Sequence, residues 1–365
     1  MIKPLVMPQQ RFYPLTVKAI DKVTEDCSVI SFDVAGDLKE TFSYKQGQYL
    51  TLKAEIAGEE VRRSYSLCSS PLDEEWKIGV KRIDGGKFST YANEQLKEGD
   101  TVEVMPPNGR FFTDIETDRA KNYVAFAAGS GITPIFSIIK THLLAEPLSH
   151  FTLFYINQQV SSIILKEEIE ALKNLFLNRF KVFHFLTQEQ RSAPLFNGRL
   201  DIEKLDVISE KMLPLEEIDD FFVCGPEEMI FMVRDYLLAK QVEAKKIHFE
   251  LFTSGQQKPG STKATKSDTA EQINCELTII EGGKAFNISL QDPNTSILDA
   301  ALGKGADLPF ACKGGVCCTC RAKVIEGAVE MQVNYALEED EVEAGYVLTC
   351  QAMPKTEKVV VDFDV

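Results

Sequence analysis

Four cysteines near the C-terminus have a spacing that suits a metal centre. Cys312, Cys317 and Cys320 follow the pattern C-x4-C-x2-C, and Cys350 comes after a further twenty-nine residues. This spacing matches the ligand pattern of plant-type [2Fe–2S] sites, in which four thiolates enclose one cluster. The pair Gly314–Gly315 lets the backbone wrap closely around the inorganic core, where amide N–H groups can hydrogen-bond sulfur. We therefore predict that these four cysteines hold a [2Fe–2S] cluster.

Structural zinc is the alternative for such a group of cysteines. Zinc sites usually combine two short C-x2-4-C or histidine-containing segments, and no second segment of that kind surrounds Cys350. Cys318 falls inside the motif as a spare thiol, and we expect it to be a small packed side chain beside the loop. Clustered cysteines in a cytosolic chain also favour a metal over disulfides. The other cysteines are scattered: Cys27, Cys68, Cys224 and Cys275.

A glycine-rich turn follows a continuous apolar stretch at residues 123–128. In that position, glycines permit a tight turn and bring the pyrophosphate of a dinucleotide onto the N-terminus of the next helix. The motif departs from G-x-G-x-x-G by ending in Pro134, which suits the first turn of a helix. An ordinary strand-to-helix turn is the alternative. The residues predicted to bind nucleotide here are Gly129, Ser130, Gly131, Ile132, Thr133 and Pro134.

Three further motifs agree with a nucleotide-dependent redox site. They are Arg63-Ser64-Tyr65-Ser66, then Gly85-Gly86-Lys87-Phe88-Ser89, and then Val223-Cys224-Gly225-Pro226. With these motifs in this order, the sequence resembles the ferredoxin–NADP reductase superfamily. In that superfamily an R-x-Y-S motif holds flavin, and a C-G-P element lies beside nicotinamide. Taken singly, R-S-Y-S also occurs by chance, with Arg63 as an ordinary surface residue.

The resemblance implies roles for individual flavin-binding residues. Arg63 would pair with a phosphate of FAD, Tyr65 would lie against the isoalloxazine ring, and Ser66 would reach the N5 region of the flavin. Gly86 and Ser89 would receive the pyrophosphate through backbone and hydroxyl donors. The full set implied in this way is Arg63, Ser64, Tyr65, Ser66, Gly85, Gly86, Phe88, Ser89 and Phe252.

The resemblance also implies a hydride-transfer site. Ser66, Cys224 and Glu250 would line it as catalytic residues. Cys224 and Gly225 would contact the nicotinamide nucleotide, and Phe252 would cover one face of the flavin. Glu250 and Phe252 end a short apolar segment, for which the alternative is a strand end packed on the core. Flavin is needed because a nicotinamide gives two electrons and an iron–sulfur centre takes one.

The elements that would position these residues fall into three domains. Residues 1–116 show short alternating segments separated by turn residues, which predicts an antiparallel β-barrel for FAD. Residues 117–252 alternate apolar strands with helical stretches, which predicts a parallel-sheet α/β domain for NAD(P). Residues 253–272 contain almost nothing to bury and predict a flexible linker. Residues 273–365 predict an α+β domain, and the resemblance implies a β-grasp ferredoxin fold for it.

Composition excludes several classes of protein. The chain has 365 residues and a formal net charge of −15, and that sign opposes sequence-independent attraction to nucleic acid or anionic lipid. The longest charge-free stretch, residues 123–139, is broken by glycines and a proline and is too short to span a membrane. Prolines near the N-terminus interrupt any signal-peptide pattern. We expect a cytoplasmic protein with neither nucleic-acid nor membrane partners.

Together with the resemblance, these features predict an NAD(P)H-dependent reductase. Hydride would reduce FAD, and the cluster would pass electrons singly to the oxygenase component of a multicomponent complex. The segments Leu308–Cys317, Asn334–Glu338 and Gly345–Cys350 resemble the reductase subunits of phenylacetyl-CoA epoxidases. This resemblance implies a diiron epoxidase of phenylacetate degradation as the partner. The alternatives are the reductase of a Rieske-type aromatic-ring oxygenase, a non-enzymatic electron carrier and a zinc-stabilised interaction protein.

The sequence favours NADPH over NADH as the electron donor. The apolar segment 151–156 is followed by residues 157–162, which include no acidic side chain to bind a ribose 2′-hydroxyl. Ser161, Ser162 and Lys166 are candidates to face a 2′-phosphate. No arginine accompanies them, so NADH stays open as the donor.

Overall fold

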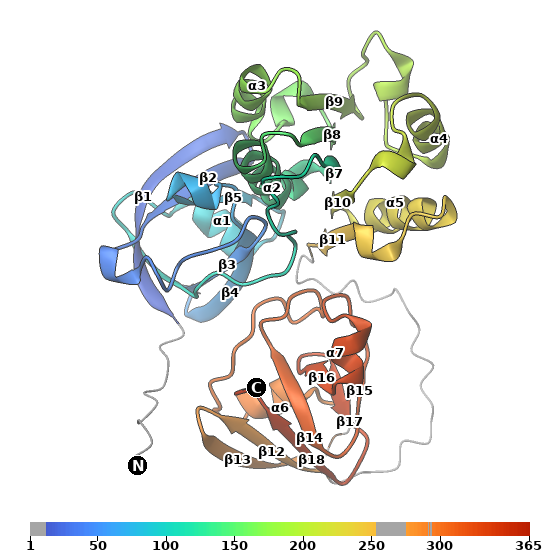
Figure 1. The fold of residues 1–365 in the computed structure, drawn as a ribbon. Helices are drawn as coiled ribbons and strands as arrows, with labels where there is room; N and C mark the ends of the chain where they lie inside the picture. Colours follow the sequence, from blue (N-terminus) through green and yellow to red (C-terminus); the bar gives the residue numbers. More distant parts are fainter. Residues whose placement is uncertain (1–11, 253–274, 291, 293) are drawn as a thin grey trace. The chain divides into compact units, whose positions relative to one another are not determined.

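Three large β-sheets organise the chain (Figure 1). The computed structural model describes residues 12–252, 275–290, 292 and 294–365, and the predicted linker at 253–272 lies outside these residues. Phe12–Phe252 form one compact unit, and the C-terminal part of the chain forms a second. Among the described residues, no helix combines the length and the apolar character needed to cross a membrane.

The first sheet is an antiparallel barrel of six strands in the order β4-β3-β6-β1-β2-β5. Its first strand alternates as predicted, with Leu15 and Val17 buried between exposed neighbours. A bridge between Leu67 and Ile78 joins the two ends of the sheet and closes the barrel. The elements are β1 (Tyr13–Thr24), β2 (Cys27–Asp33), β3 (Tyr49–Ile56), β4 (Glu59–Ser66), β5 (Trp76–Lys81), α1 (Lys87–Glu94) and β6 (Thr101–Val104).

The second sheet is parallel, with the strand order β11-β10-β7-β8-β9. The chain enters at β7, adds β8 and β9 on one side, and then returns to place β10 on the other side of β7. In doubly wound sheets, ligands bind at the carboxyl ends of the strands where the order reverses, which here are β7 and β10. The strands are β7 (Asn122–Ala128), β8 (His150–Asn157), β9 (Phe180–Leu186), β10 (Asp220–Gly225) and β11 (Ile247–Leu251).

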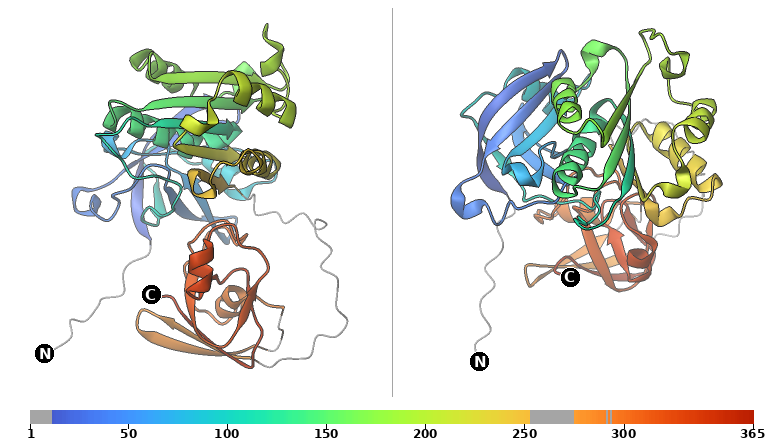
Figure 2. Two further views of the ribbon diagram at one scale, coloured as in Figure 1. Left: turned by 45° about the vertical axis from the view of Figure 1, so that its right-hand side comes forward. Right: turned by 45° about the horizontal axis from the view of Figure 1, so that its top comes forward.

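Helices cover both faces of the parallel sheet. The helices are α2 (Ile132–Ala145), α3 (Lys166–Leu175), α4 (Ile202–Lys211) and α5 (Glu227–Ala239). α2 and α3 lie on the side of the sheet that faces the barrel, and α4 and α5 lie on the other side (Figure 1, Figure 2). Cys27 and Cys68 of the barrel belong to the same buried apolar cluster as Ile135 and Ile139 of α2. This shared core joins the barrel and the parallel sheet into one unit.

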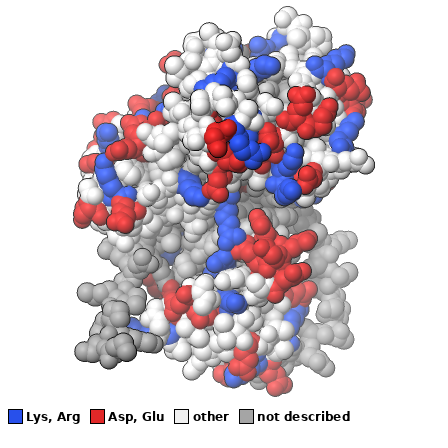
Figure 3. Space-filling view, viewed as in Figure 1, with Lys and Arg blue, Asp and Glu red and all other residues white. Residues whose placement is uncertain are grey.

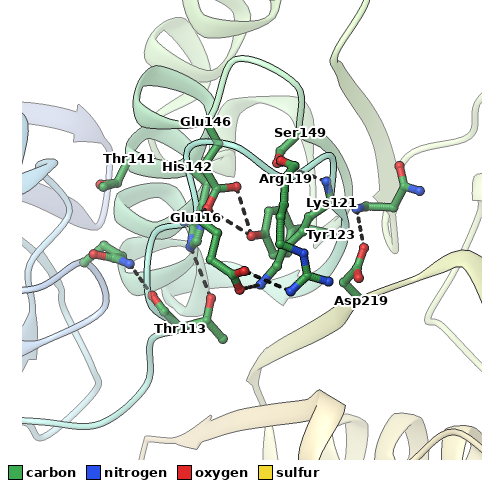
Figure 4. A network of polar contacts seen from close by, with 12 residues as sticks. Thr113, Glu116, Arg119, Lys121, Tyr123, Thr141, His142, Glu146, Ser149 and Asp219 are labelled. Carbon is green, nitrogen blue, oxygen red and sulfur yellow. Dashed lines mark hydrogen bonds and ion pairs between the residues drawn. The ribbon is translucent and has the colours of Figure 1, made fainter.

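A buried carboxylate anchors the connection between the barrel and the parallel sheet (Figure 4). Glu146 is fully buried and accepts hydrogen bonds from the Tyr123 hydroxyl at 2.9 Å and from the Glu116 backbone amide at 2.9 Å. Burial raises the pKa of Glu146, but the His142 side chain and the Glu116 amide lower it to about 2. The ionised carboxylate therefore ties the connecting segment to the end of α2.

The C-terminal unit is built on a mixed sheet with the order β13-β12-β18-β14-β16. β12 and β18 run parallel and the other pairs antiparallel, while α6 buries Ile297, Leu298 and Ala301 in the same core as the sheet. This is the predicted α+β arrangement. The elements are β12 (Cys275–Glu281), β13 (Lys284–Leu290), α6 (Ile297–Leu302), β14 (Arg321–Glu326), β15 (Val329–Met331), α7 (Glu339–Glu343), β16 (Tyr346–Leu348), β17 (Ala352–Pro354) and β18 (Lys358–Asp362).

Candidate functional site

Three residues predicted to be catalytic come together at the boundary between the barrel and the parallel sheet. Ser66 ends β4, and its hydroxyl donates a hydrogen bond to Glu250 Oε2 at 3.0 Å. Glu250 lies in β11, directly opposite Cys224 in the parallel register with β10. Residues from three strands and two domains therefore meet at one place.

Burial shapes the electrostatics of this group. It raises the pKa of Glu250 to about 7, and the hydrogen bond from Ser66 opposes that rise. Cys224 is fully buried, and burial followed by the negative charge of Glu250 raises the pKa of its thiol well above the ordinary value. The thiol is therefore neutral at physiological pH, whereas the carboxyl group can take up or release a proton near neutrality. Such a shifted carboxyl group at a domain boundary is typical of an active site.

The R-S-Y-S segment presents a cation and an aromatic ring on β4. Arg63 is exposed, and its guanidinium donates to the Arg62 carbonyl at 2.7 Å. No carboxylate among the described residues pairs with Arg63, so its charge is available to a phosphate group. The Tyr65 ring is half-buried and rests on Phe88, with ring centroids 5.7 Å apart. The Ser64 hydroxyl lies 2.9 Å from the Thr51 hydroxyl within the barrel.

The second glycine motif forms the start of α1. Gly85 adopts a positive φ of 70°, and Gly86 caps the helix without a side chain. The Ser89 hydroxyl is buried and accepts from the Ile83 amide at 3.2 Å, so it serves the turn itself. Phe88 is also buried, in the barrel core. The Gly86 amide is likewise engaged, donating to the Ile83 carbonyl at 2.9 Å, and the contacts of this turn with a pyrophosphate stay predictions.

The glycine turn after β7 lies beside the carboxyl end of β10. Gly129 has a positive φ of 52° and open space beyond its Cα, whereas a Cβ on Gly131 would lie 2.2 Å from the Cys224 carbonyl oxygen. Gly131 is therefore required for the close approach of the turn to β10. Gly129 and Ser130 are partly accessible. The other predicted residues of the turn are buried: Gly131, Ile132, Thr133 and Pro134.

The remaining predicted residues lie at the ends of neighbouring strands. Gly225 ends β10, and it is half-buried beside the glycine turn. Phe252 follows β11, and its side chain is 41% exposed. An exposed aromatic side chain at this point is available to cover a bound ring.

The structure adds an acidic side chain to the segment that we expect to influence the choice of nucleotide donor. Residues 157–162 after β8 include no acidic side chain, but the loop after β9 brings Glu189 to this segment, where its carboxylate accepts from the Val160 amide at 3.3 Å. The neighbouring Ser162 hydroxyl is engaged in the turn by the Gln159 amide at 3.0 Å. An acidic side chain therefore lies beside the segment that we expect to face the ribose of the nucleotide, and the preference for NADPH stays a prediction.

The cysteine loop of the C-terminal unit gathers four sulfur atoms. The Cys317 thiol donates to Cys312 Sγ at 3.2 Å, and contacts between thiols also link Cys350 with Cys312 and with Cys320. The hydrogen bond between Cys317 and Cys312 lowers the pKa of Cys312 and raises that of Cys317, so these thiols interact directly. The Cys318 thiol donates to the Ala336 carbonyl at 3.3 Å.

Two glycine-linked backbone contacts support the loop. The Gly314 amide donates to Cys312 Sγ at 3.3 Å, and Gly315 has a positive φ of 73° with the Val333 carbonyl only 2.8 Å from where a Cβ would be. The loop therefore offers converging thiols with an amide donor already directed at sulfur. This arrangement fits a [2Fe–2S] cluster.

Three protein-family models match the chain in the order of its sheets. An oxidoreductase FAD-binding domain matches residues 14–113, and an oxidoreductase NAD-binding domain matches residues 126–235. A 2Fe-2S iron-sulfur cluster binding domain matches residues 279–355. The fold and the site thus define an NAD(P)H oxidoreductase that uses FAD and a [2Fe–2S] cluster.

Similarity to known proteins extends over the whole chain. It is 43% identical to one of the subunits of 1,2-phenylacetyl-CoA epoxidase from Escherichia coli (strain K12), covering 97% of this chain and 98% of the relative. It is 33% identical to the ferredoxin reductase component of 3-ketosteroid-9-alpha-monooxygenase from Rhodococcus rhodochrous, covering 96% of each. The solved structure of phthalate dioxygenase reductase shares the fold, with a TM-score of 0.58 at 24% identity over 96% of this chain and 98% of that one.

The chain belongs to the ferredoxin–NADP reductase superfamily, within the family whose members carry a C-terminal 2Fe-2S ferredoxin domain. This confirms the predicted fold class, the reductase activity and the FAD and [2Fe–2S] cofactors. It also sets aside the non-enzymatic carrier and the zinc-stabilised interaction protein. The roles of individual site residues stay predictions.

Proposed function

We propose that this reductase supplies electrons to the oxygenase component of a multicomponent complex, and that the complex is a diiron epoxidase acting on the aromatic ring of phenylacetyl-CoA. The observation that carries the proposal is the 43% identity to a component of a phenylacetyl-CoA epoxidase over 97% of the chain. A similarity of that extent includes the C-terminal domain, from which electrons leave the protein.

Two domains bring the donor and the flavin together. When bound, FAD takes two electrons as hydride and the cluster takes one at a time, so a two-electron donor can serve a one-electron acceptor. Arg63 holds a phosphate, and Tyr65 supports the ring system. Gly129 and Ser130 offer their backbone to the nucleotide at the start of α2.

The residues at the boundary prepare the site for hydride transfer. The buried Cys224 thiol excludes water and carries no charge. Glu250, with a pKa of about 7, holds a proton at its carboxyl group and shares a hydrogen bond with Ser66 Oγ. The pair Ser66–Glu250 would hold or release a proton at the Glu250 carboxyl group when a flavin is bound at this boundary.

Cys312, Cys317, Cys320 and Cys350 hold the cluster in the C-terminal unit. The Gly314 amide, which already donates to Cys312 Sγ, stabilises negative charge on sulfur. Hydrogen bonds of this kind raise the reduction potential of a cluster and so ease its reduction.

Reconstitution tests the proposed acceptor. The holoprotein is mixed with the purified diiron oxygenase component, phenylacetyl-CoA, NADPH and O2, and the ring epoxide product is measured by chromatography. A matched control is the Cys312→Ser protein, which should oxidise NADPH but support no product. Normal reduction of the cluster with no product formation would contradict the epoxidase assignment.

A different oxygenase is the second candidate for the acceptor. The 33% identity to the reductase component of a 3-ketosteroid monooxygenase favours it, because that similarity also spans 96% of the chain. A Rieske-type ring oxygenase with its own aromatic substrate, used in place of the diiron component and phenylacetyl-CoA, would then support NADPH-dependent product formation.

A further inference from the structure

Gly79 is an unexpected residue in the middle of a buried strand. It lies in β5, opposite Val29 of β2, where a glycine weakens a strand because it has no side chain to pack. Its backbone has no positive φ that would require glycine. A glycine in such a position usually marks a close approach by another part of the chain.

Thr133 makes that close approach. A Cβ on Gly79 would lie 2.6 Å from Thr133 Cγ2, and the next atom in its way, Thr133 Cβ, would be 3.9 Å away. Carbon atoms in contact are normally about 3.5–4.0 Å apart, so one added methyl group would push the two elements apart by about 1 Å. The space beside Gly79 is thus filled by a single methyl group.

The orientation of Thr133 connects this contact to the glycine turn at residues 129–131, which we call the nucleotide turn. Its hydroxyl donates to the Ser130 carbonyl at 3.0 Å, which holds the methyl group toward Gly79. Ser130 is one of the two accessible residues of the turn. The contact therefore links a barrel strand directly to the backbone that would receive the nucleotide.

The same face of α2 continues along the barrel. Ser137, one helical turn after Thr133, donates to the Ser69 carbonyl at 2.6 Å. Thr141, one turn further, lies 2.8 Å from the Ser70 hydroxyl. Of these three contacts, the one between Thr133 and Gly79 lies nearest to the nucleotide turn.

We propose that Gly79 is a positioning residue: its missing side chain sets how closely the nucleotide turn approaches the flavin barrel, and hence the distance over which hydride passes. The proposal rests on hydride transfer from NAD(P)H to FAD and is independent of which oxygenase receives the electrons. When reacting groups are misplaced by about 1 Å, a step such as hydride transfer can slow by about 100-fold.

The test is Gly79→Ala in the FAD-loaded full chain. Anaerobic stopped-flow reduction of the flavin is expected to slow about tenfold or more, with the dissociation constant for NAD⁺ and the FAD content changing less than about twofold. The charge-transfer absorbance between nicotinamide and flavin should weaken, which reports separation without turnover. Gly36→Ala is the matched control, because nothing lies within 4 Å of a Cβ there and its φ is ordinary.

A second substitution makes the test specific to the methyl contact. Thr133→Ser removes Cγ2 and keeps the hydroxyl. In a protein that carries Thr133→Ser, adding Gly79→Ala should therefore slow flavin reduction much less than it does in the wild-type protein. An equal slowing in both backgrounds overturns the proposal, as does a Gly79→Ala protein with the normal rate and absorbance. If the Gly79→Ala protein does not bind FAD, Ser137→Ala provides the test, because it removes a hydrogen bond between the same face of α2 and the barrel. Slower flavin reduction with unchanged NAD⁺ binding in this variant supports the proposal. A normal rate of flavin reduction overturns it.

Discussion

Ser66 Oγ and Glu250 Oε2 lie 3.0 Å apart, although 184 positions separate the two residues in the chain. The bond crosses from the flavin barrel to the domain of the parallel sheet. It joins a residue of the R-S-Y-S motif to a carboxyl group whose pKa is raised to about 7 by burial. At the boundary between the two domains, this bond brings the predicted flavin-binding motif next to a carboxyl group that can titrate near neutral pH.

We expect Glu250→Ala and Cys224→Ala to slow flavin reduction without loss of FAD. Both side chains lie at the boundary and not at a phosphate-binding position, so hydride transfer should fall by about 10²-fold for Glu250 and by a smaller factor for Cys224. Stopped-flow absorbance under anaerobic conditions measures both rates. Unchanged rates in both variants would remove these residues from the site.

Arg63→Ala should weaken FAD binding and leave hydride transfer largely unchanged. Its guanidinium is exposed and free of a carboxylate partner among the described residues, so its loss should weaken FAD binding about tenfold or more and leave the reduction rate of the remaining holoprotein near normal. The flavin content after gel filtration gives the result. Full retention of FAD would argue against a phosphate contact.

The raised pKa of Glu250 predicts a pH-dependent stability. A carboxyl group with a pKa of about 7 in the folded protein and 4.5 otherwise holds its proton more tightly when folded. Its contribution to stability is complete below pH 4.5 and is lost as the pH rises through 7. Relative to Glu250→Gln, the wild-type protein should therefore be less stable at pH 8 than at pH 5.

Urea unfolding of both proteins at the two pH values provides the measurement. The glutamine variant is the control because it keeps the size and hydrogen-bonding capacity of the side chain without its titration. The same stability difference at pH 5 and pH 8 would show that Glu250 has an ordinary pKa.

Single Cys→Ser variants should separate the cluster ligands from the spare thiol. Replacement of Cys312, Cys317, Cys320 or Cys350 should abolish iron and acid-labile sulfide while FAD and NAD(P)H oxidation with an artificial acceptor persist. Cys318→Ser should keep the cluster, because its thiol donates to the Ala336 carbonyl. Loss of iron from the Cys318 variant as complete as from the others would make the ligand assignment wrong.

Glu189 should influence the choice between NADH and NADPH. Its carboxylate at the Val160 amide would repel a 2′-phosphate, so Glu189→Gln should raise kcat/KM for NADPH relative to NADH by about five- to tenfold. Glu167→Gln, an exposed acidic residue at the start of α3, is a suitable control. An unchanged ratio would separate Glu189 from nucleotide recognition.

The acidic residues around α7 should steer the oxygenase partner. Acidic side chains gather there (Figure 3), with Glu338, Glu339, Asp340 and Glu343 exposed. Charges of this kind are screened beyond about 10 Å at 0.1 M salt, so electron delivery should weaken as salt rises. Glu338 and Glu341 cap the helix and are best left in place.

The variant that tests this prediction neutralises only Glu339, Asp340 and Glu343. Product formation should fall several-fold at low salt and lose most of its salt dependence, while NADPH oxidation with an artificial acceptor stays normal. A salt-independent turnover shared by wild type and variant would contradict docking through α7.

Much of this protein could be predicted from the sequence because the signals are local. Cys312, Cys317 and Cys320 lie on one loop, so their spacing alone brings the ligands together. The glycine turn at 129–131 follows a buried strand and precedes a helix, and each of these elements has its own periodicity. The barrel, the parallel sheet and the α+β domain follow from such patterns and from the order of the motifs.

Other features depend on how distant segments pack. Glu189 reaches Val160 from the end of a different strand, and Gly79 meets Thr133 across a domain boundary. The Ser89 hydroxyl is taken up by its own turn, which its place in a motif does not reveal. Spacing along the chain specifies neighbours only within a loop or one turn of a helix, whereas contacts across a sheet or a boundary and the pKa shifts from burial arise only when the elements are packed together.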